Sequence, residues 1–119
     1  MAFLAIAPKL ATAAQPLSPT TTTVSAAPSD KSALKAAWIY VSPIGEAGWT
    51  YQHEQARRQV QKDFGSSVQT TFVADVPEGH DAERVLRDLA RQGNQIIFTT
   101  SFGYMEPAMR VAREFPAVK

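Results

Sequence analysis

The sequence of 119 residues contains no cysteine. It therefore forms no disulfide, thiolate metal site or cysteine nucleophile, and it lacks the residue that attaches a lipid anchor to a mature bacterial amino terminus. An excess of one charge is also missing, because 12 basic and 11 acidic residues are interspersed and give a formal net charge of +1. A nucleic-acid interface needs clustered Lys and Arg, so we expect no nucleic-acid partner. Since no run approaches the roughly 20 apolar residues of a membrane span, we also expect no transmembrane segment.

The first 34 residues have a composition that is poorly suited to a hydrophobic core. They contain four prolines and a run of threonines at Thr20–Thr23, so they offer little apolar surface to offset the entropy of ordering. The apolar stretch Met1–Ala7 and the small residues of Ala11–Ala13 resemble the end of an export signal with its cleavage site, although a basic start is missing. We interpret residues 1–34 as a degenerate signal peptide or a disordered leader, and residues 35–119 as the folded part.

Hydrophobic patterning in the folded part alternates between the periods of strands and helices. It predicts strands over residues 38–41, 68–73 and 95–100, and helices over residues 51–64, 81–92 and 105–115. A glycine or a proline follows each helix and stops it. Right-handed crossovers between parallel strands place this βαβαβα order in the α/β class. We therefore predict a three-layer, Rossmann-like unit whose parallel sheet has the strand order 2-1-3.

Apolar positions on the predicted helices indicate which faces turn toward the sheet. In the three helices in turn, these positions are Ala56, Val60 and Phe64; Ala82, Val85, Leu86 and Leu89; and Met105, Ala108, Met109, Ala112 and Phe115. Asp81 is predicted to cap the second helix, and Trp38 is predicted to lie in the core. Charged residues of alternating sign are interpreted as solvated helix faces: Glu54, Arg57, Arg58, Asp63, Glu83, Arg84, Arg87, Asp88 and Arg91.

Two loops with matching composition follow predicted strands. Ser42–Tyr51 leaves the first strand and Thr99–Pro107 leaves the third, and each carries a glycine, an aromatic residue and a carboxylate near the start of a helix. Loops at the carboxyl ends of parallel strands form ligand sites in open α/β sheets. In the order 2-1-3 the first and third strands are neighbours, so we expect Gly45–Thr50 to lie close to Ser101–Glu106. This juxtaposition predicts a small-molecule binding site.

A fourth strand is expected to begin near Pro116–Lys119, after the last predicted helix. A sheet of only three strands would leave one strand edge and one helix face uncovered. We therefore interpret the sequence as the front part of a longer protein.

Several stretches of the folded part resemble one family of proteins. The stretches are residues 35–54, 75–79, 94–107 and 111–116, which include both loops at matching spacing. They resemble the basic membrane protein family of substrate-binding proteins, which serve ATP-binding-cassette importers and include purine nucleoside receptors. The resemblance implies a type I periplasmic binding protein fold, in which two α/β lobes joined by a hinge enclose the ligand. It implies that residues 35–119 are part of the amino-terminal lobe, that the location is periplasmic or extracytoplasmic, and that a membrane permease is the partner.

The same resemblance implies ligand contacts in the two loops. Trp49 matches the first-loop aromatic residue that stacks on a purine. Glu106 matches the acid of the family pattern G-F-x-x-x-D, in which Phe102 keeps the aromatic and Ser101 replaces the glycine. The predicted ligand-binding residues are Trp49, Glu106, Phe102, Ser101, Glu46, Gly48 and Tyr51. Plainer interpretations also exist, since an indole can pack beneath a helix start and a carboxylate can stabilise a helix amino terminus.

The first loop departs from the pattern of the nucleoside receptors in the family. They carry D-x-S-F-N-Q, whereas residues 46–51 here read E-A-G-W-T-Y. The larger indole and the missing asparagine leave a purine base and a purine nucleoside as open alternatives. One lobe would supply only one wall of the site, so we expect the isolated chain to bind purine weakly or not at all.

Three functions stay open at this point. The first is the solute-binding component of an importer, the second a ligand-sensing regulatory domain of the same fold, and the third a nucleoside-processing enzyme. We expect no enzymatic activity and no cofactor, because Ser101 has no nearby base and Gly45 and Gly48 lack the third glycine of a dinucleotide fingerprint. We expect no metal either, because His53 and His80 have no partner at ligand spacing.

Overall fold

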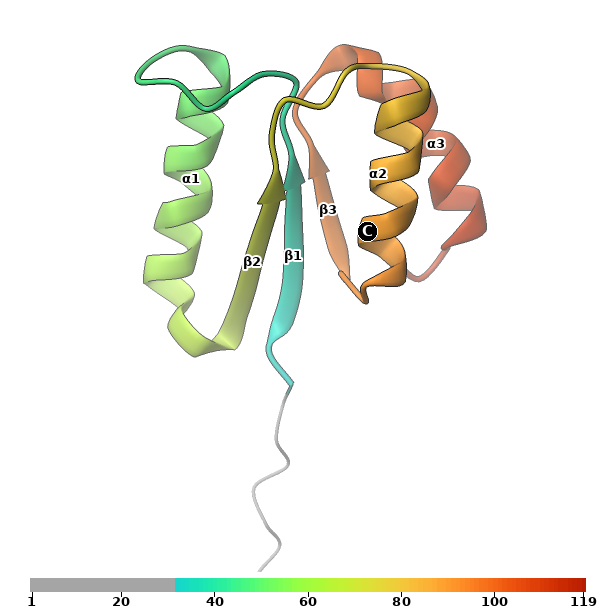
Figure 1. The fold of residues 1–119 in the computed structure, drawn as a ribbon. Coiled ribbons are helices and arrows are strands. Elements are labelled where there is room, and N and C mark those ends of the chain that lie inside the picture. The colour runs from blue at the N-terminus through green and yellow to red at the C-terminus, as the bar shows by residue number, and fades with distance from the viewer. Residues whose placement is uncertain (1–31) are drawn as a thin grey trace, which may run out of the picture.

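The computed structural model describes residues 32–119, which form one sheet flanked by helices (Figure 1). The elements are β1 (Leu34–Ile39), α1 (Trp49–Phe64), β2 (Val68–Val73), α2 (His80–Arg91), β3 (Ile96–Thr99) and α3 (Met105–Glu114), with 3-10 turns at Gly65–Ser67 and Phe102–Tyr104. The strands are parallel and lie in the order β2-β1-β3. The predicted α/β class, element order and strand order are therefore confirmed. The interpretation of the leader falls on residues 1–31, outside the described residues.

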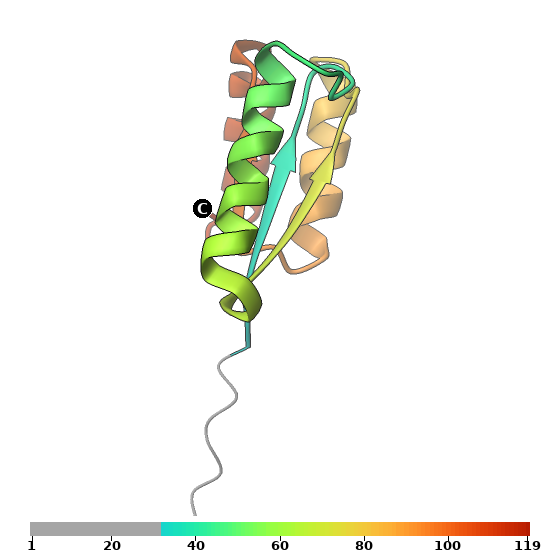
Figure 2. The same cartoon turned by 90° about the vertical axis from the view of Figure 1, so that its left-hand side faces the viewer.

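The sheet is covered on both faces, which gives three layers (Figures 1 and 2). On the α1 face, Trp38 and Tyr40 form a buried cluster against which Val60 packs. On the opposite face, Ile39 clusters with Leu86 of α2 and Val111 of α3. Because β1 is the central strand, its residues from Ala36 onward are buried, and Trp38 lies in the core as predicted. Within residues 32–119, no helix is both long and apolar enough to cross a membrane.

Strand boundaries follow backbone pairing rather than apolar runs. β2 has the predicted bounds, and it lies at the sheet edge. The first strand was expected at residues 38–41, but β1 begins at Leu34 because Leu34 already pairs with Val68 of β2. It ends at Ile39, although the Tyr40 N–H still donates to the Val73 carbonyl at 2.9 Å. Pairing with β2 therefore extends β1 to residues that precede its apolar run.

The face of α1 that turns toward the sheet is largely polar: Val60 packs inward as predicted, but the other two predicted positions do not. Ala56 and Phe64 are exposed, and the buried residues of α1 are Thr50 and Glu54. Glu54 is 0% exposed. It accepts two hydrogen bonds from Arg57 and one from Arg58, each at 2.7 Å, and a fourth at 3.1 Å from the Tyr40 hydroxyl beneath it. The expectation that these charged residues form a solvated face is therefore wrong for Glu54, whose ion pairs and hydrogen bond to Tyr40 satisfy its carboxylate within the protein.

Stability in acid is expected to depend on Glu54. The Arg57 guanidinium, supported by Arg58 and Tyr40, overcomes the effect of burial and lowers the pKa of Glu54 from 4.5 to about 2. A lowered pKa means that the stabilisation is complete above pH 4.5 and is lost as the pH falls toward 2. We expect the free energy of unfolding to fall by about 3 kcal/mol over this range through this group. Urea titrations at several pH values, repeated with Glu54→Gln, will measure it; a parallel pH profile for both proteins would contradict it.

The predicted buried face is confirmed for α2, and for α3 it is confirmed only at Ala108 and Phe115. In α2, the predicted stripe holds, because Ala82, Leu86 and Leu89 are buried. Asp81 is not the amino-terminal cap of α2, however, because Gly79 occupies the cap position and no side chain forms a capping hydrogen bond there. In α3, Met105, Met109 and Ala112 are exposed instead of buried, whereas the inward residues are Pro107, Ala108, Val111 and Phe115.

Contact with α2 explains why α3 is rotated from its predicted orientation. Arg87 of α2 forms paired hydrogen bonds with Glu114 at 2.6 and 2.7 Å, and Arg110 bonds to Glu83 at 2.8 Å. These pairs and the Val111–Leu86 cluster turn one flank of α3 toward α2 rather than straight onto the sheet. The sequence pattern of α3 alone does not indicate that this helix also packs against α2.

Lys119 lies beside β3 in the geometry of a parallel strand. Its N–H donates to the Gln95 carbonyl at 2.9 Å, and its carbonyl accepts from the Ile97 N–H at 2.7 Å. Bonds to the residues on either side of one partner are the pattern of a parallel ladder. Lys119 therefore pairs with the edge of β3 that faces away from β1.

Candidate functional site

The loops that follow β1 and β3 meet at the carboxyl edge of the sheet. The Trp49 indole N–H donates to the Thr100 carbonyl at 2.6 Å, across 51 residues of sequence. Thr100 is itself fixed, because its hydroxyl donates to the Ile39 carbonyl at 2.8 Å. The predicted approach of the two loops is therefore observed, and Trp49 lies next to the segment that contains Ser101.

Trp49 is the first residue of α1, and its side chain is largely open to solvent. The residue is 65% exposed, so it is not packed beneath the helix start. One ring edge contacts His53, with centroids 4.8 Å apart and planes inclined at 66°. Gly48 precedes it with φ of 93°, a conformation that favours glycine, so this turn into the helix depends on that residue. The indole is thus tethered through its nitrogen and held at the helix start by a turn that other residues adopt only with strain.

The second loop presents an exposed aromatic ring and an exposed carboxylate. Phe102 is 86% exposed within the 3-10 turn that leads to α3. Glu106 lies in the first turn of α3 with its side chain 71% exposed, and its nearest cation is Arg110 at 3.6 Å. A carboxylate in this position also interacts favourably with the amino terminus of the helix. Its exposure leaves it available to a ligand as well.

The remaining predicted residues belong to the first loop and its helix. Glu46 is exposed, and Tyr51 is partly buried on α1. The Ser42 and Thr50 hydroxyls lie 2.7 Å apart and join the two ends of this loop by a hydrogen bond. The loop is therefore closed at its base, and Glu46 projects from its middle.

A third loop contacts the loop that follows β3, and the sequence did not predict this contact. Glu78 lies between β2 and α2, and its Oε1 accepts a hydrogen bond from the Ser101 hydroxyl. The Tyr104 hydroxyl, which is buried, donates to the Val76 carbonyl of the same loop at 2.6 Å. Burial, and secondarily the charge of Glu78, raise the pKa of Tyr104 to about 12, so this hydroxyl stays a donor at neutral pH. Because β1 lies between β2 and β3 in the sheet, the strand order did not indicate that the loops after β2 and β3 would touch.

The groups at the carboxyl edge are mostly hydroxyls and carboxylates. Among residues 32–119 there is no group of three or more His, Cys, Asp or Glu side chains that could hold a metal ion. Hydroxyls and carboxylates of this kind can orient a ligand through hydrogen bonds.

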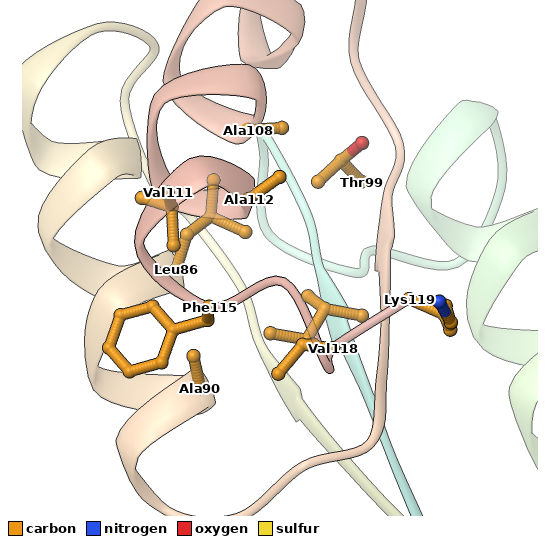
Figure 3. Close-up of a pocket in the computed structure, with 10 residues that line it drawn as sticks. Leu86, Ala90, Thr99, Ala108, Val111, Ala112, Phe115, Val118 and Lys119 are labelled. Carbon is orange, nitrogen blue, oxygen red and sulfur yellow. The ribbon is translucent and has the colours of Figure 1, made fainter.

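A mostly apolar hollow lies elsewhere, between α2, α3 and β3 (Figure 3). Its volume is about 120 Å³, and its lining is mostly apolar, with Leu86, Val111 and Phe115 on the helix side and Val118 opposite. It lies on the face of the sheet that α2 and α3 cover, its lining includes neither Trp49 nor Phe102, and it offers few polar groups to orient a ligand. The loops at the carboxyl edge are therefore the better candidate for a polar small molecule.

Comparisons with known proteins agree with this fold. A purine-binding protein from Brucella abortus is 55% identical over 86 residues, which cover 72% of this chain and 25% of that protein. A putative ABC transporter glucose-binding protein from Haloferax volcanii is 37% identical over 95 residues, which cover 80% of this chain and 24% of that protein. A solved ABC transporter solute-binding protein from Conexibacter woesei shares the fold, with a TM-score of 0.66 at 24% identity over 72% of this chain and 28% of that one.

The matches cover different shares of this chain and of its relatives. The chain spans about a quarter of the length of these relatives. Residues 33–119 match the model of one family, described as ABC transporter substrate-binding protein PnrA-like. This match covers most of the chain and all six regular elements. The chain belongs to the Bmp family of ABC transporter substrate-binding proteins.

Proposed function

We propose that this chain contributes one wall of the ligand site in an extracytoplasmic substrate-binding protein that delivers a purine base or nucleoside to the permease of an ABC importer. The observation that carries the proposal is the Trp49–Thr100 hydrogen bond, which holds an exposed indole at the carboxyl edge of the sheet. The name of the Brucella abortus relative supports purine as the ligand class. Residues 35–119 then form part of an amino-terminal lobe, and the protein binds and releases its ligand unchanged.

In the proposed site, stacking and hydrogen bonds together hold the ligand. The indole of Trp49 stacks on the purine, which is worth about 1–3 kcal/mol for a base on an aromatic side chain. Glu106 and Ser101 supply polar contacts to a ring N–H, an amino group or a ribose hydroxyl, and Phe102 adds a second apolar surface. Glu46, Gly48 and Tyr51 line the first-loop side. A site of this kind becomes tight when a second lobe closes over it.

A chimera will test this function. Residues 33–119 replace the matched segment of the Brucella abortus protein, and the chimera is titrated calorimetrically with adenine, adenosine, inosine and guanosine. We expect at least one purine to bind with micromolar or lower Kd, and the isolated 119-residue chain to bind the same purine far more weakly, because it offers only one wall. A folded chimera that gives no heat with any purine would refute the purine assignment.

Glucose is a second candidate ligand, because the Haloferax volcanii relative is named as a putative glucose-binding protein. The apolar face of a sugar ring can also lie on an exposed indole, and its hydroxyls can donate to carboxylates. Glucose therefore belongs in the same titration. Binding of glucose without binding of any purine would move the proposal to this ligand class.

A further inference from the structure

The loop between β2 and α2 reaches the candidate ligand site through one side chain, Glu78. We propose that Glu78 is a positioning residue, which accepts the hydrogen bond that the Ser101 hydroxyl donates and thereby leaves Ser101 as an acceptor toward the ligand. The ligand class selected is one that presents a hydrogen-bond donor at this point. The proposal rests on the proposed function for the location of the ligand. It adds which partner donates and which accepts in the hydrogen bond between Ser101 and the ligand.

Glu78 is held in place by geometry as well as by its hydrogen bond. Its carboxyl group occupies the space beside Gly103 that a Cβ atom at that position would take. The hydrogen bond from Ser101 and the bond from the Tyr104 hydroxyl to Val76 tie the two loops together at two points. The absent side chain of Gly103 and the hydroxyl of Ser101 thus form a seat for this carboxylate.

The single proton of the Ser101 hydroxyl determines which hydrogen bonds Ser101 can form with a ligand. A serine hydroxyl has one proton and two lone pairs, and an ionised carboxylate can only accept. Once Ser101 donates to Glu78, only its lone pairs are left for the ligand. A carbonyl oxygen of a ligand at this point would face lone pairs and lose its hydrogen bond with water without replacement.

The neighbouring side-chain donor is occupied in the same way. The indole N–H of Trp49 already donates to the Thr100 carbonyl. Glu106, an exposed side chain of the second loop, is a carboxylate and therefore an acceptor when ionised. Trp49, Ser101 and Glu106 accordingly present acceptors or an aromatic surface outward, which matches a ligand rich in amino, ring N–H or hydroxyl groups.

The first arm of the test measures ligand preference in the chimera described above. Adenine and hypoxanthine exchange donor and acceptor along one edge of the same ring, so their Kd ratio reports the polarity of the contact. We expect the unmodified chimera to discriminate roughly tenfold, and Glu78→Ala and Ser101→Ala each to reduce this to less than about threefold. The double variant should show no further reduction, because both residues act on one contact. Asp81→Asn, an exposed carboxylate three residues away, should leave the ratio unchanged.

The second arm needs no ligand and uses the 119-residue chain itself. Amide NMR signals of Ser101 and Phe102 should shift, and their hydrogen exchange should quicken, in Glu78→Ala and in Gly103→Ala, whose methyl group would displace the carboxyl. Asp81→Asn should leave these signals in place. Loop signals that do not respond to Glu78→Ala would overturn the positioning role.

The two arms separate failure of this inference from failure of the proposed function. If the chimera binds purine and its discrimination survives Glu78→Ala, the role of Glu78 is refuted and the proposed function stands. If the chimera binds neither purine, the purine assignment is refuted and the NMR arm alone decides whether Glu78 positions Ser101.

Discussion

Replacing Glu54 with alanine is expected to lower the free energy of unfolding by about 3–5 kcal/mol, the usual loss when one member of a buried ion pair is removed. Glu54 is fully buried, and the side chain of Arg57 is only 13% exposed. Arg57 spans both carboxylate oxygens at 2.7 Å, donates to the Thr70 hydroxyl at 2.7 Å and lies 4.9 Å from the centre of the Phe72 ring. Without Glu54, this guanidinium would stay between α1 and the sheet with its charge uncompensated.

Urea denaturation of the 119-residue chain at pH 7 will measure the loss. Asp63→Ala is the matched control, because Asp63 is an exposed carboxylate on the same helix, and its loss should be below about 1 kcal/mol. The double variant Glu54→Leu/Arg57→Met removes both charges and should recover much of the stability, since apolar pairs often replace buried ion pairs without loss. A loss below about 1 kcal/mol for Glu54→Ala would show that water compensates the charge of Arg57.

The same residue shows why the sequence did not predict the orientation of α1. Glu54, Arg57 and Arg58 have the i, i+3 and i+4 spacing that is typical of ion pairs on solvent-exposed helices. Spacing cannot distinguish an exposed set from a buried one. The deciding group is the hydroxyl of Tyr40, which lies on the sheet and reaches Glu54 from below. This contact exists only after β1 and α1 have packed together, so no local pattern contains it.

Other parts of the fold were predictable because their signals are local or topological. The strand at residues 68–73 and the buried stripe of α2 follow from side-chain periodicity, and both are observed. The meeting of the first and third loops follows from the strand order 2-1-3, and the Trp49–Thr100 bond realises it.

The features that were missed depend on contacts between elements that are distant in sequence. α3 is rotated by its contacts with α2, and Glu78 reaches Ser101 from a loop beyond the neighbouring strand. The candidate site was therefore located from the sequence, whereas its third loop was found only in the structure.

Replacing Trp49 with alanine is expected to weaken purine binding by the chimera by about 1–3 kcal/mol, a factor of roughly 5 to 150 in Kd. The physical reason is the loss of the stacking surface, together with the Thr100 tether that orients it. Trp49→Phe separates these two contributions, because it keeps an aromatic face and loses the indole N–H. We expect its Kd to fall between those of the unmodified chimera and Trp49→Ala, as measured by calorimetry.

Trp38 provides the control that separates ligand contact from folding. It is 6% exposed and stacks on Phe98 with ring centroids 4.5 Å apart, so Trp38→Phe should reduce stability while leaving the Kd of the folded chimera nearly unchanged. Trp49→Ala should show the opposite pattern, because a side chain that is 65% exposed contributes little burial. If Trp49→Ala reduces stability and leaves purine affinity unchanged, Trp49 fastens two loops together and does not stack on the ligand.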